Sequence, residues 1–377
     1  MTEIRVDTIV DAAGTGAPNF TTAPTVGGVA LGSLATSSFT SSGSAPSSPS
    51  DGAVWWDTAN SVLMIYANSA WQTVTLGVIP PVGYYGDRAI VFNGGYNGST
   101  WSDKIQYFDI TTTGNASLFG SDTYNRKYNG NMAAAGGSRA IIFQGSNGSG
   151  GFINDISYVT TTTTGNATNF GTGAVSRYDG GACSDGTYAM ACNGNNSSHA
   201  AMANIDYVTI ATTGNAAAFG NDWISRAQNT AASDGTYGYI IGMTTSSGQS
   251  MSRFTFGTSG SAISYGTNGN FQGNYGAGFS GNEDYAIHAG GRHGSTNLTQ
   301  VYRWTWATDT VAYVGALPAS RRNTSGTSNS SRFVLTGGQS TNEITYIDLA
   351  SGSSTSDFGD LLSGQNLMCS PTSGPAS

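Results

Sequence analysis

The feature that most limits how this chain can fold is an apolar run that ends at a glycine and occurs six times. Successive copies of this glycine are 51, 49, 48, 48 and 47 residues apart. The six glycines are Gly94, Gly145, Gly194, Gly242, Gly290 and Gly337. A period of about fifty residues with several short strands per copy is typical of a β-propeller, in which each copy forms one blade.

The second copy illustrates the contents of each repeat. Residues 140–143 read Ala-Ile-Ile-Phe, and such a run without polar alternation predicts a strand buried on both faces. A second strand with a tyrosine is expected at 156–159, followed by a threonine-rich stretch that ends in Gly165-Asn166. Because glycine and asparagine tolerate positive φ, we expect a tight turn there and an outer strand ending at Phe170-Gly171. An arginine follows in most copies, at Arg126, Arg177, Arg226 and Arg321 or Arg322.

The order of glycine, tyrosine, large aromatic residue and arginine resembles the kelch repeat. The glycine doublet of that repeat is present at Gly94-Gly95, Gly290-Gly291 and Gly337-Gly338, and it is degenerate in the other copies. The fourth copy departs furthest, because Ser252-Arg253-Phe254 occupies the region where the others carry the tyrosine. The resemblance implies a kelch-like propeller.

The two ends of the repeat region predict how the ring closes. The tail at 365–371 resembles the strand that precedes the apolar run in every later copy, whereas the first copy has only residues 80–85 there. We therefore expect the C-terminal strand to complete the first blade, which would remove two free sheet edges. The predicted fold is all-β, with a six-bladed propeller over residues 80–377.

Two further segments precede the propeller. Residues 1–50 are dense in Gly, Ser, Thr, Ala and Pro, so they cannot bury enough surface to offset their ordering entropy and are expected to be an extended strap or linker. In residues 51–79, two apolar runs flank a turn at 57–61 and predict a β-hairpin with a third short strand. Its three tryptophans have more aromatic surface area than so small a module can leave exposed to solvent. We therefore expect the module to pack on a partner or on its own copies.

The opening segment from Ile4 to Phe20 is similar to the start of many structural proteins of marine tailed phages, especially those that infect cyanobacteria. The pattern from Gly52 to Trp71 looks like a small module of phage tail and head fibres. The resemblance implies a virion protein that is assembled in the host cytoplasm and exposed on the particle as a tail fibre, nozzle-associated or capsid decoration protein. The residues expected to contact other virion proteins or further copies of the chain are Ile4, Val6, Ile9, Phe20, Trp55, Trp56 and Trp71.

Composition excludes several classes of function. The net charge is −8 and the chain has only the lysines Lys104 and Lys127, so no positive field is available for nucleic acid. No apolar run reaches the length of a signal peptide core or a membrane span, and we expect neither secretion by the general route nor membrane insertion. Cys183, Cys192 and Cys369 lack metal-site spacing; the first two could face each other across a hairpin, but small buried residues are the simpler interpretation.

Two enzymatic alternatives were considered. A sialidase-like hydrolase would use arginines such as Arg177 to bind a carboxylate, and residues 184–188 resemble the sialidase Asp-box without its intervening residues. The arginines, however, recur at one repeat position, as structural contacts would. A copper site like that of kelch-bladed oxidases would need ligands, but His199, His288 and His293 do not have suitable spacing. We therefore expect no enzyme activity, no cofactor and no metal.

Binding by loops is the remaining hypothesis. The loops between the apolar run and the tyrosine strand differ more among the copies than the strands do, and they should emerge on one face of a propeller. Stacking and hydrogen bonding to host surface sugar are expected from Tyr96, Trp101, Asn196, Arg292 and His293. The alternative is that these loops are ordinary solvated turns.

Overall fold

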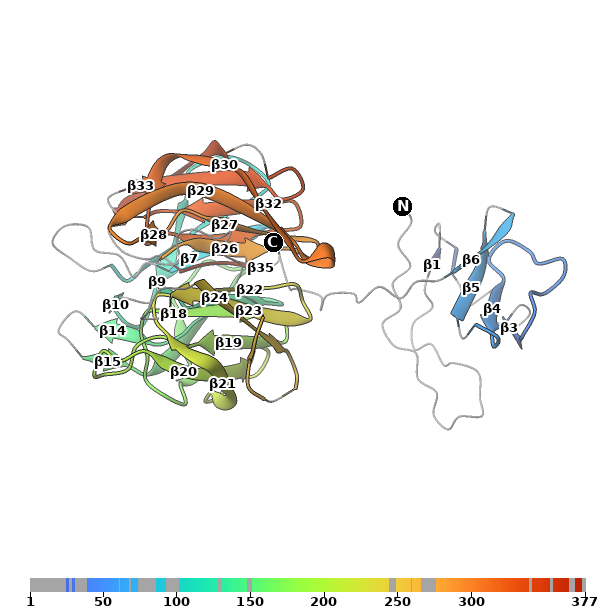
Figure 1. Cartoon of the computed structure of the whole chain (residues 1–377), viewed down its shortest axis with the longest axis horizontal. Helices are drawn as coiled ribbons and strands as arrows, with labels where there is room; N and C mark the ends of the chain where they lie inside the picture. Colours follow the sequence, from blue (N-terminus) through green and yellow to red (C-terminus); the bar gives the residue numbers. More distant parts are fainter. Residues whose placement is uncertain are drawn as a thin grey trace. The chain divides into compact units, whose positions relative to one another are not determined.

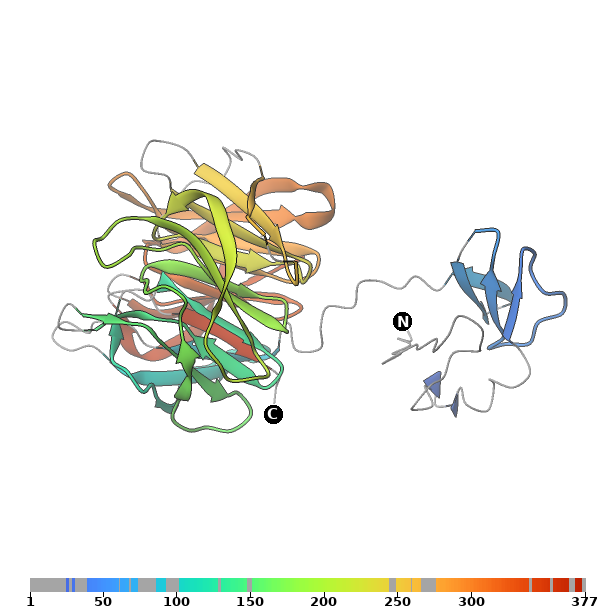
Figure 2. The ribbon, with the colours of Figure 1, turned by 90° about the horizontal axis from the view of Figure 1, so that it is seen from below.

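A computed structural model describes residues 25–26, 29–30, 39–60, 62–67, 69–73, 86–92, 102–127, 130–147, 151–243, 249–258, 260–265, 276–338, 341–352, 355–365 and 370–374. The chain divides into two compact units, Met1–Ile79 and Pro80–Ser377 (Figures 1 and 2). Both are all-β, and the only helix in the described ranges is the short 3₁₀ turn η2 (Trp306–Thr308). The expected contact residues Ile4, Val6, Ile9 and Phe20 lie outside the described residues.

The first unit contains a two-stranded ladder and a four-stranded sheet. The ladder pairs β1 (Thr25–Val26) with β2 (Val29–Ala30). The sheet has the order β3 (Phe39–Ser42), β4 (Val54–Asp57), β5 (Val62–Ala67) and β6 (Ala70–Thr73). The predicted hairpin and third strand are confirmed as β4, β5 and β6. Strand β3 was not predicted; it pairs parallel to β4 and places the start of this sheet before residue 51.

Trp55 forms the centre of this small sheet. Its side chain is 5% exposed, its ring centroid lies 5.4 Å from that of Trp71, and its indole N–H donates to the Ser42 carbonyl at 3.0 Å. That bond explains the β3 pairing, because the serine-rich segment contributes backbone acceptors. Trp56, on the opposite face of β4, is 37% exposed. Contact of these tryptophans with a partner stays a prediction, and Trp56 is the one whose ring is open to it.

The second unit contains six sheets of at least four strands within the described residues. The strand orders of the first three sheets are as follows. Sheet one has the order β35 (Ser370–Gly374), β7 (Arg88–Phe92), β8 (Lys104–Asp109) and β9 (Ser117–Ser121). Sheet two has the order β12 (Ala133–Gly136), β13 (Arg139–Ile142), β16 (Asp155–Thr160) and β17 (Thr168–Thr172). Sheet three has the order β11 (Gly130–Asn131), β18 (Gly180–Ser184), β19 (Tyr188–Cys192), β20 (Met202–Thr209) and β21 (Ala217–Arg226).

The other three sheets repeat this order. Sheet four has β22 (Thr230–Ser233), β23 (Tyr237–Met243), β24 (Gln249–Thr255) and β25 (Ile263–Ser264). Sheet five has β26 (Gly278–Gly281), β27 (Tyr285–Ala289), β29 (Thr296–Thr305) and β30 (Thr310–Arg321), with β28 (Arg292–His293) on the far end of β29. Sheet six has β31 (Ser325–Ser328), β32 (Arg332–Thr336), β33 (Thr341–Asp348) and β34 (Thr355–Gln365). A small extra sheet pairs β10 (Arg126–Lys127), β14 (Gly145–Asn147) and β15 (Phe152–Ile153).

The repeat is confirmed, but its alignment in the later copies is corrected. The second strand of the six sheets begins at Arg88, Arg139, Tyr188, Tyr237, Tyr285 and Arg332. In this register Gly242, Gly290 and Gly337 match Asn193, and not Gly194 as the spacing of the glycines indicated. Asn193, Gly290 and Gly337 share a left-handed backbone with φ of 56°, 69° and 58°. Asparagine tolerates this conformation, so Asn193 can replace the first glycine of the Gly-Gly doublet in the third copy. The doublet was therefore not recognisable there from the sequence.

The innermost strands of the six sheets contact one another in a cycle. Strand β12 contacts β35 and β18, β22 contacts β18 and β26, and β31 contacts β26 and β35. In Figure 1 the inner strands β18, β22, β26 and β35 lie in the middle of the unit, whereas β21 and β30 lie at its periphery. The expected pairing of the C-terminal strand with the first apolar run is present between β35 and β7. The strand occupies residues 370–374, later than the predicted 365–371.

The threonine-rich turns have a different role from the predicted one. Gly165 and Asn166 do not adopt positive φ, and the prediction of that conformation is wrong for all three Gly-Asn pairs. Instead, the Asn166 side chain accepts the Ser121 amide of the preceding sheet at 3.0 Å, and the Ala167 amide donates to the Ser121 carbonyl at 2.9 Å. The same side-chain contact is made by Asn215 to Thr172 and by Asn115 to Asp360. These turns therefore bind neighbouring sheets together.

Candidate ligand-binding surface

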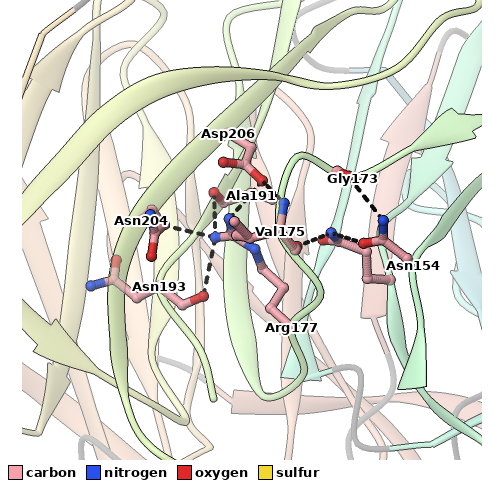
Figure 3. Close-up of polar contacts among 9 residues, drawn as sticks. Asn154, Gly173, Val175, Arg177, Ala191, Asn193, Asn204 and Asp206 are labelled. Carbon is pink, nitrogen blue, oxygen red and sulfur yellow. Dashed lines mark hydrogen bonds and ion pairs between the residues drawn. The ribbon is translucent and has the colours of Figure 1, made fainter. Parts of the chain in front are cut away.

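The repeated arginines are buried inside the sheets. Figure 3 shows Arg177, whose side chain is 0% exposed and whose Nη2 lies 2.7 Å from Oδ2 of Asp206. Its Nη1 donates to the carbonyls of Ala191, Asn193 and Asn204 at 3.0, 3.1 and 2.8 Å. One guanidinium thus joins two neighbouring strands of the third sheet and the turn beyond them. The carboxylate compensates the cost of burying the charge.

The equivalent arginines are used in the same way. Arg126 pairs with Asp122 at 2.7 Å and Arg226 pairs with Asp222 at 3.4 Å. The equivalent residue at the end of β30 in the fifth sheet is Arg321, which pairs with Glu343 of the sixth sheet. All of these guanidinium groups are at least nine-tenths buried. They are therefore structural, as the single repeat position indicated, and none of them is open to a carboxylate from solvent.

Three of the five predicted ligand-binding residues are among the described residues, and they lie in two separate segments. Tyr96 and Trp101 fall outside the described residues. Asn196 accepts the amides of Ser198 and Ala200 at 2.9 and 3.0 Å, so its side chain shapes its own turn. Arg292 and His293 form β28 in the fifth sheet, where His293 is exposed and Arg292 Nε donates to the Gly294 carbonyl at 2.5 Å. Whether these residues bind a ligand stays a prediction.

Two of the predicted loops meet at an aromatic cluster that the sequence did not reveal. The ring of Phe152, in β15, lies 5.7 Å from that of Tyr178 and 6.5 Å from that of His199. The Tyr178 and His199 rings are 5.8 Å apart, and the Tyr178 hydroxyl is hydrogen-bonded to Nδ1 of His199. Phe152 is half-buried and His199 is exposed, so one side of the cluster is open to solvent. We call these three residues the loop cluster.

The loop cluster is held by backbone pairing between its segments. Tyr178 forms an isolated β-bridge with Asn195, which in turn bridges Ala201, so the two ends of the His199 loop are fixed beside Tyr178. His199 itself has a φ of 59°, a left-handed conformation that is uncommon for a residue with a side chain. Residues in such conformations persist only where their surroundings determine them, and they occur often at binding sites.

Asp179, next to Tyr178, is a buried acid at a special repeat position. It has a φ of 56°, and its counterparts Gln228, Gly276 and Asn323 have φ of 54°, 63° and 57°. Its carboxyl is 4% exposed; Oδ2 accepts from Gln228 Nε2 at 3.4 Å, and Oδ1 has no hydrogen-bond partner among the described residues. Burial raises the pKa of the Asp179 carboxyl from 3.8 to about 7. It is the only acid among the four left-handed counterparts.

The remaining sequence candidates have no arrangement suited to chemistry. His288 is fully buried beside Phe279, and burial lowers its pKa from 6.5 to about 4. Cys183 and Cys192 are buried free thiols, and each stands opposite a different residue across the hairpin, Met190 and Gly181 respectively. The part of the chain that the structure describes contains no cluster of His, Cys, Asp or Glu able to hold a metal ion. Nor does it contain a helix long and apolar enough to cross a bilayer.

Comparison of the chain with models of known protein families and with curated proteins finds no match.

Proposed function

We propose that this chain is a non-enzymatic structural protein of a tailed-phage particle. Its N-terminus docks on other virion proteins, and its second unit binds a protein or a host surface glycan. The docking part of the proposal is supported by the similarity of residues 4–20 and 52–71 to segments of phage structural and fibre proteins. The exposed Trp56 gives the small module an aromatic contact residue for a virion partner or for a second copy of the chain.

The second unit is, in this proposal, a closed six-bladed kelch-like propeller. The cycle of contacts among the inner strands and the pairing of β35 with β7 support closure. A further support is Arg332 of the sixth sheet, whose Nη1 donates to the carbonyls of Ile110 and Thr111 in the first sheet at 3.1 and 2.7 Å. A closed ring has no long exposed central edges, and it presents its connecting loops as one binding face.

The observation that carries the binding function is the contrast between repeated and unrepeated residues. The repeated arginines are buried and paired with carboxylates, whereas Phe152 and His199 are unrepeated residues that reach the surface. Aromatic rings with adjacent hydrogen-bonding groups stack on sugar rings and on protein side chains. A sialidase-like hydrolase, the alternative, needs an arginine open to its substrate, and the buried arginines do not provide one.

Binding to host cells tests the proposal. We expect the full-length protein to bind host cells, and the double substitution Phe152→Ala with His199→Ala to reduce binding at least about tenfold, as loss of a central aromatic contact does. Thr213→Ala, at an exposed turn outside the loop cluster, is the control and should bind as wild type. Release of reducing sugar from host polysaccharide in the same samples would contradict the non-enzymatic assignment.

Docking is tested separately with a deletion of residues 1–38, which leaves β3 and its sheet intact. Phage that produce the shortened protein should assemble particles that lack it, as measured by its abundance in purified virions. Normal incorporation of the shortened protein would show that the N-terminal segment is not the docking element.

A further inference from the structure

A stacked arginine and tyrosine recur at one place in the sheets of the second unit. Arg88 lies over the ring of Tyr107 at 5.2 Å and donates to the Thr161 carbonyl of the next sheet at 2.8 Å. Arg332 lies over Tyr346 at 4.8 Å and donates to Thr111 at 2.7 Å. Two more arginines combine stacking and donation to the next sheet, namely Arg139 over Tyr158 and Arg303 over Tyr285. The repeated function of this pair is to link adjacent sheets.

Arg253 of the fourth sheet is the exception. Its guanidinium lies between two rings, 4.5 Å from the centroid of Tyr237 and 4.3 Å from that of Tyr265. Within the described residues it forms no salt bridge, and its hydrogen bond is made to the Tyr265 side chain and not to the backbone of a neighbouring sheet. Its side chain is half-buried, and its guanidinium is packed against the two rings. Stacking on aromatic faces leaves the N–H donors at the edge of the guanidinium plane available.

Aromatic residues surround this arginine. Tyr239 stacks on Trp306 with ring centroids 4.5 Å apart and an interplanar angle of 17°, and Trp304 lies 4.9 Å from Tyr239. Tyr265 packs 5.6 Å from Tyr239. Tyr239 and Trp304 are buried, whereas Trp306 and Tyr265 are half-buried. Partly exposed rings therefore lie in the same cluster as a half-buried arginine that has no carboxylate partner.

Hydrogen bonds fix the indole rings of this cluster. Trp306 Nε1 donates to the Asn282 carbonyl at 2.9 Å, and Trp304 Nε1 donates to Asp309 Oδ1 at 3.2 Å. Asp234 accepts the hydroxyl of Tyr239 at 2.9 Å and two turn amides. Both carboxylates are engaged with neutral donors and do not form a salt bridge with Arg253. A rigid aromatic site of this kind loses little conformational entropy when a ligand binds.

We propose that Arg253, Tyr265 and Trp306 form a binding site for an acidic saccharide. The guanidinium pairs with the carboxylate of a uronic acid through two charge-assisted hydrogen bonds, and the apolar face of the pyranose ring packs on the half-buried rings. Asp234 and Asp309 repel the anion, so affinity requires the arginine and the rings together. The site is separate from the loop cluster, and its existence does not depend on the binding proposed for that cluster.

The test uses the full-length protein and two matched probes, hexagalacturonate and its fully methyl-esterified form, with affinities measured by calorimetry. We expect the acidic probe to bind at least about tenfold more tightly than the ester, because the ester cannot form a charged pair with Arg253. Arg253→Met should remove this preference. Equal affinity for the two probes, or no binding of the acid at a concentration of about 5 mM, would overturn the proposal.

Arg332→Met is the matched control, because the Arg332–Tyr346 pair occupies the repeat position of the Tyr237–Arg253 pair with the two residue types exchanged, and Arg332 donates to a neighbouring sheet. This control should unfold at a lower temperature than wild type and keep the wild-type affinity for hexagalacturonate. Unchanged affinity in Arg253→Met, or an equal loss in both variants, would also overturn the site. The Phe152→Ala and His199→Ala protein should bind hexagalacturonate as wild type, which separates failure of this site from failure of the loop cluster.

Discussion

Replacing Asp179 with asparagine isolates the effect of one buried carboxyl on the pH dependence of folding. Asparagine has nearly the shape of the protonated acid, carries no charge and tolerates the left-handed backbone at this position. In the unfolded chain the carboxyl has its ordinary pKa of 3.8, whereas burial raises the pKa to about 7 in the folded protein. Between these values only the folded protein keeps the proton, so stability falls as the pH rises.

The expected size of this effect follows from the two pKa values. A difference between 3.8 and about 7 corresponds to about 4 kcal/mol of unfolding free energy. The contribution is fully present below pH 3.8 and is lost as the pH rises through about 7. Relative to wild type, Asp179→Asn should therefore be similar in stability at about pH 4 and more stable by up to about 4 kcal/mol at about pH 8.

His288 acts in the opposite direction. Burial lowers its pKa from 6.5 to about 4, so between these values the unfolded chain holds a proton that the folded protein lacks. Stability therefore rises with pH over this interval, by about 3 kcal/mol. The two effects largely cancel in the total stability of the wild-type protein, so each is measured as the difference between wild type and the variant that lacks the titrating group.

The assay is denaturant unfolding of wild type, Asp179→Asn and His288→Asn from about pH 4 to about pH 8, with the difference from wild type taken at each pH. The pH dependence of that difference is the readout, because His288→Asn also changes packing. A constant difference between Asp179→Asn and wild type across this range would refute the argument that burial perturbs this carboxyl.

Two sets of substitutions and one deletion test the contacts that hold the sheets together. Gly120→Ala would place Cβ 2.0 Å from the carbonyl oxygen of the turn in the next sheet and should lower stability by about 1–3 kcal/mol in thermal unfolding, whereas Gly114→Ala, with no atom within 4 Å, should be close to neutral. Arg177→Met should cost about 3–5 kcal/mol because it leaves Asp206 buried without its partner, and adding Asp206→Asn should restore part of the loss; no recovery would argue against the charge explanation. Deletion of residues 370–377 exposes the edge of β7 and should cause concentration-dependent association by light scattering; a monomer with wild-type stability would contradict the role of β35.

The sequence predicted those parts of the fold that depend on a repeated local pattern. Apolar runs such as residues 140–142 form the second strands, and the tail pairs with β7 because it supplies the strand that the first copy lacks. The Gly-Asn turns were misinterpreted because their role lies in contacts with another sheet, as Asn166 shows with Ser121. Strand β3 was missed because a serine-rich segment has no apolar pattern and is held by its backbone and by the indole of Trp55.

The candidate site was predicted only at the level of its loops. The loops between the apolar run and the tyrosine strand were expected to carry binding residues, and Phe152 and His199 of the loop cluster lie in two of these loops. Tyr178 was not identified, since it follows the structural Arg177 and nothing in its local sequence indicates a bond with His199. Contacts between loops of two different sheets depend on how the sheets are arranged, and a periodic pattern carries no information about them.

Arg253 shows how a repeat protein acquires a surface that its other copies lack. In four sheets a stacked arginine donates to the next sheet, and each of these arginines is thereby used for structure. The fourth copy keeps the stacking but replaces the bond to the next sheet with a second tyrosine ring, that of Tyr265. In the fourth sheet the arginine lies on the third strand and the tyrosine on the second, whereas these positions are exchanged in the first, second and sixth sheets. This exchange does not explain the change, because Arg303 of the fifth sheet also lies on the third strand and still donates to the next sheet. What differs is the Tyr265 ring, which directly follows the short outer strand β25 and lies 4.3 Å from the Arg253 guanidinium.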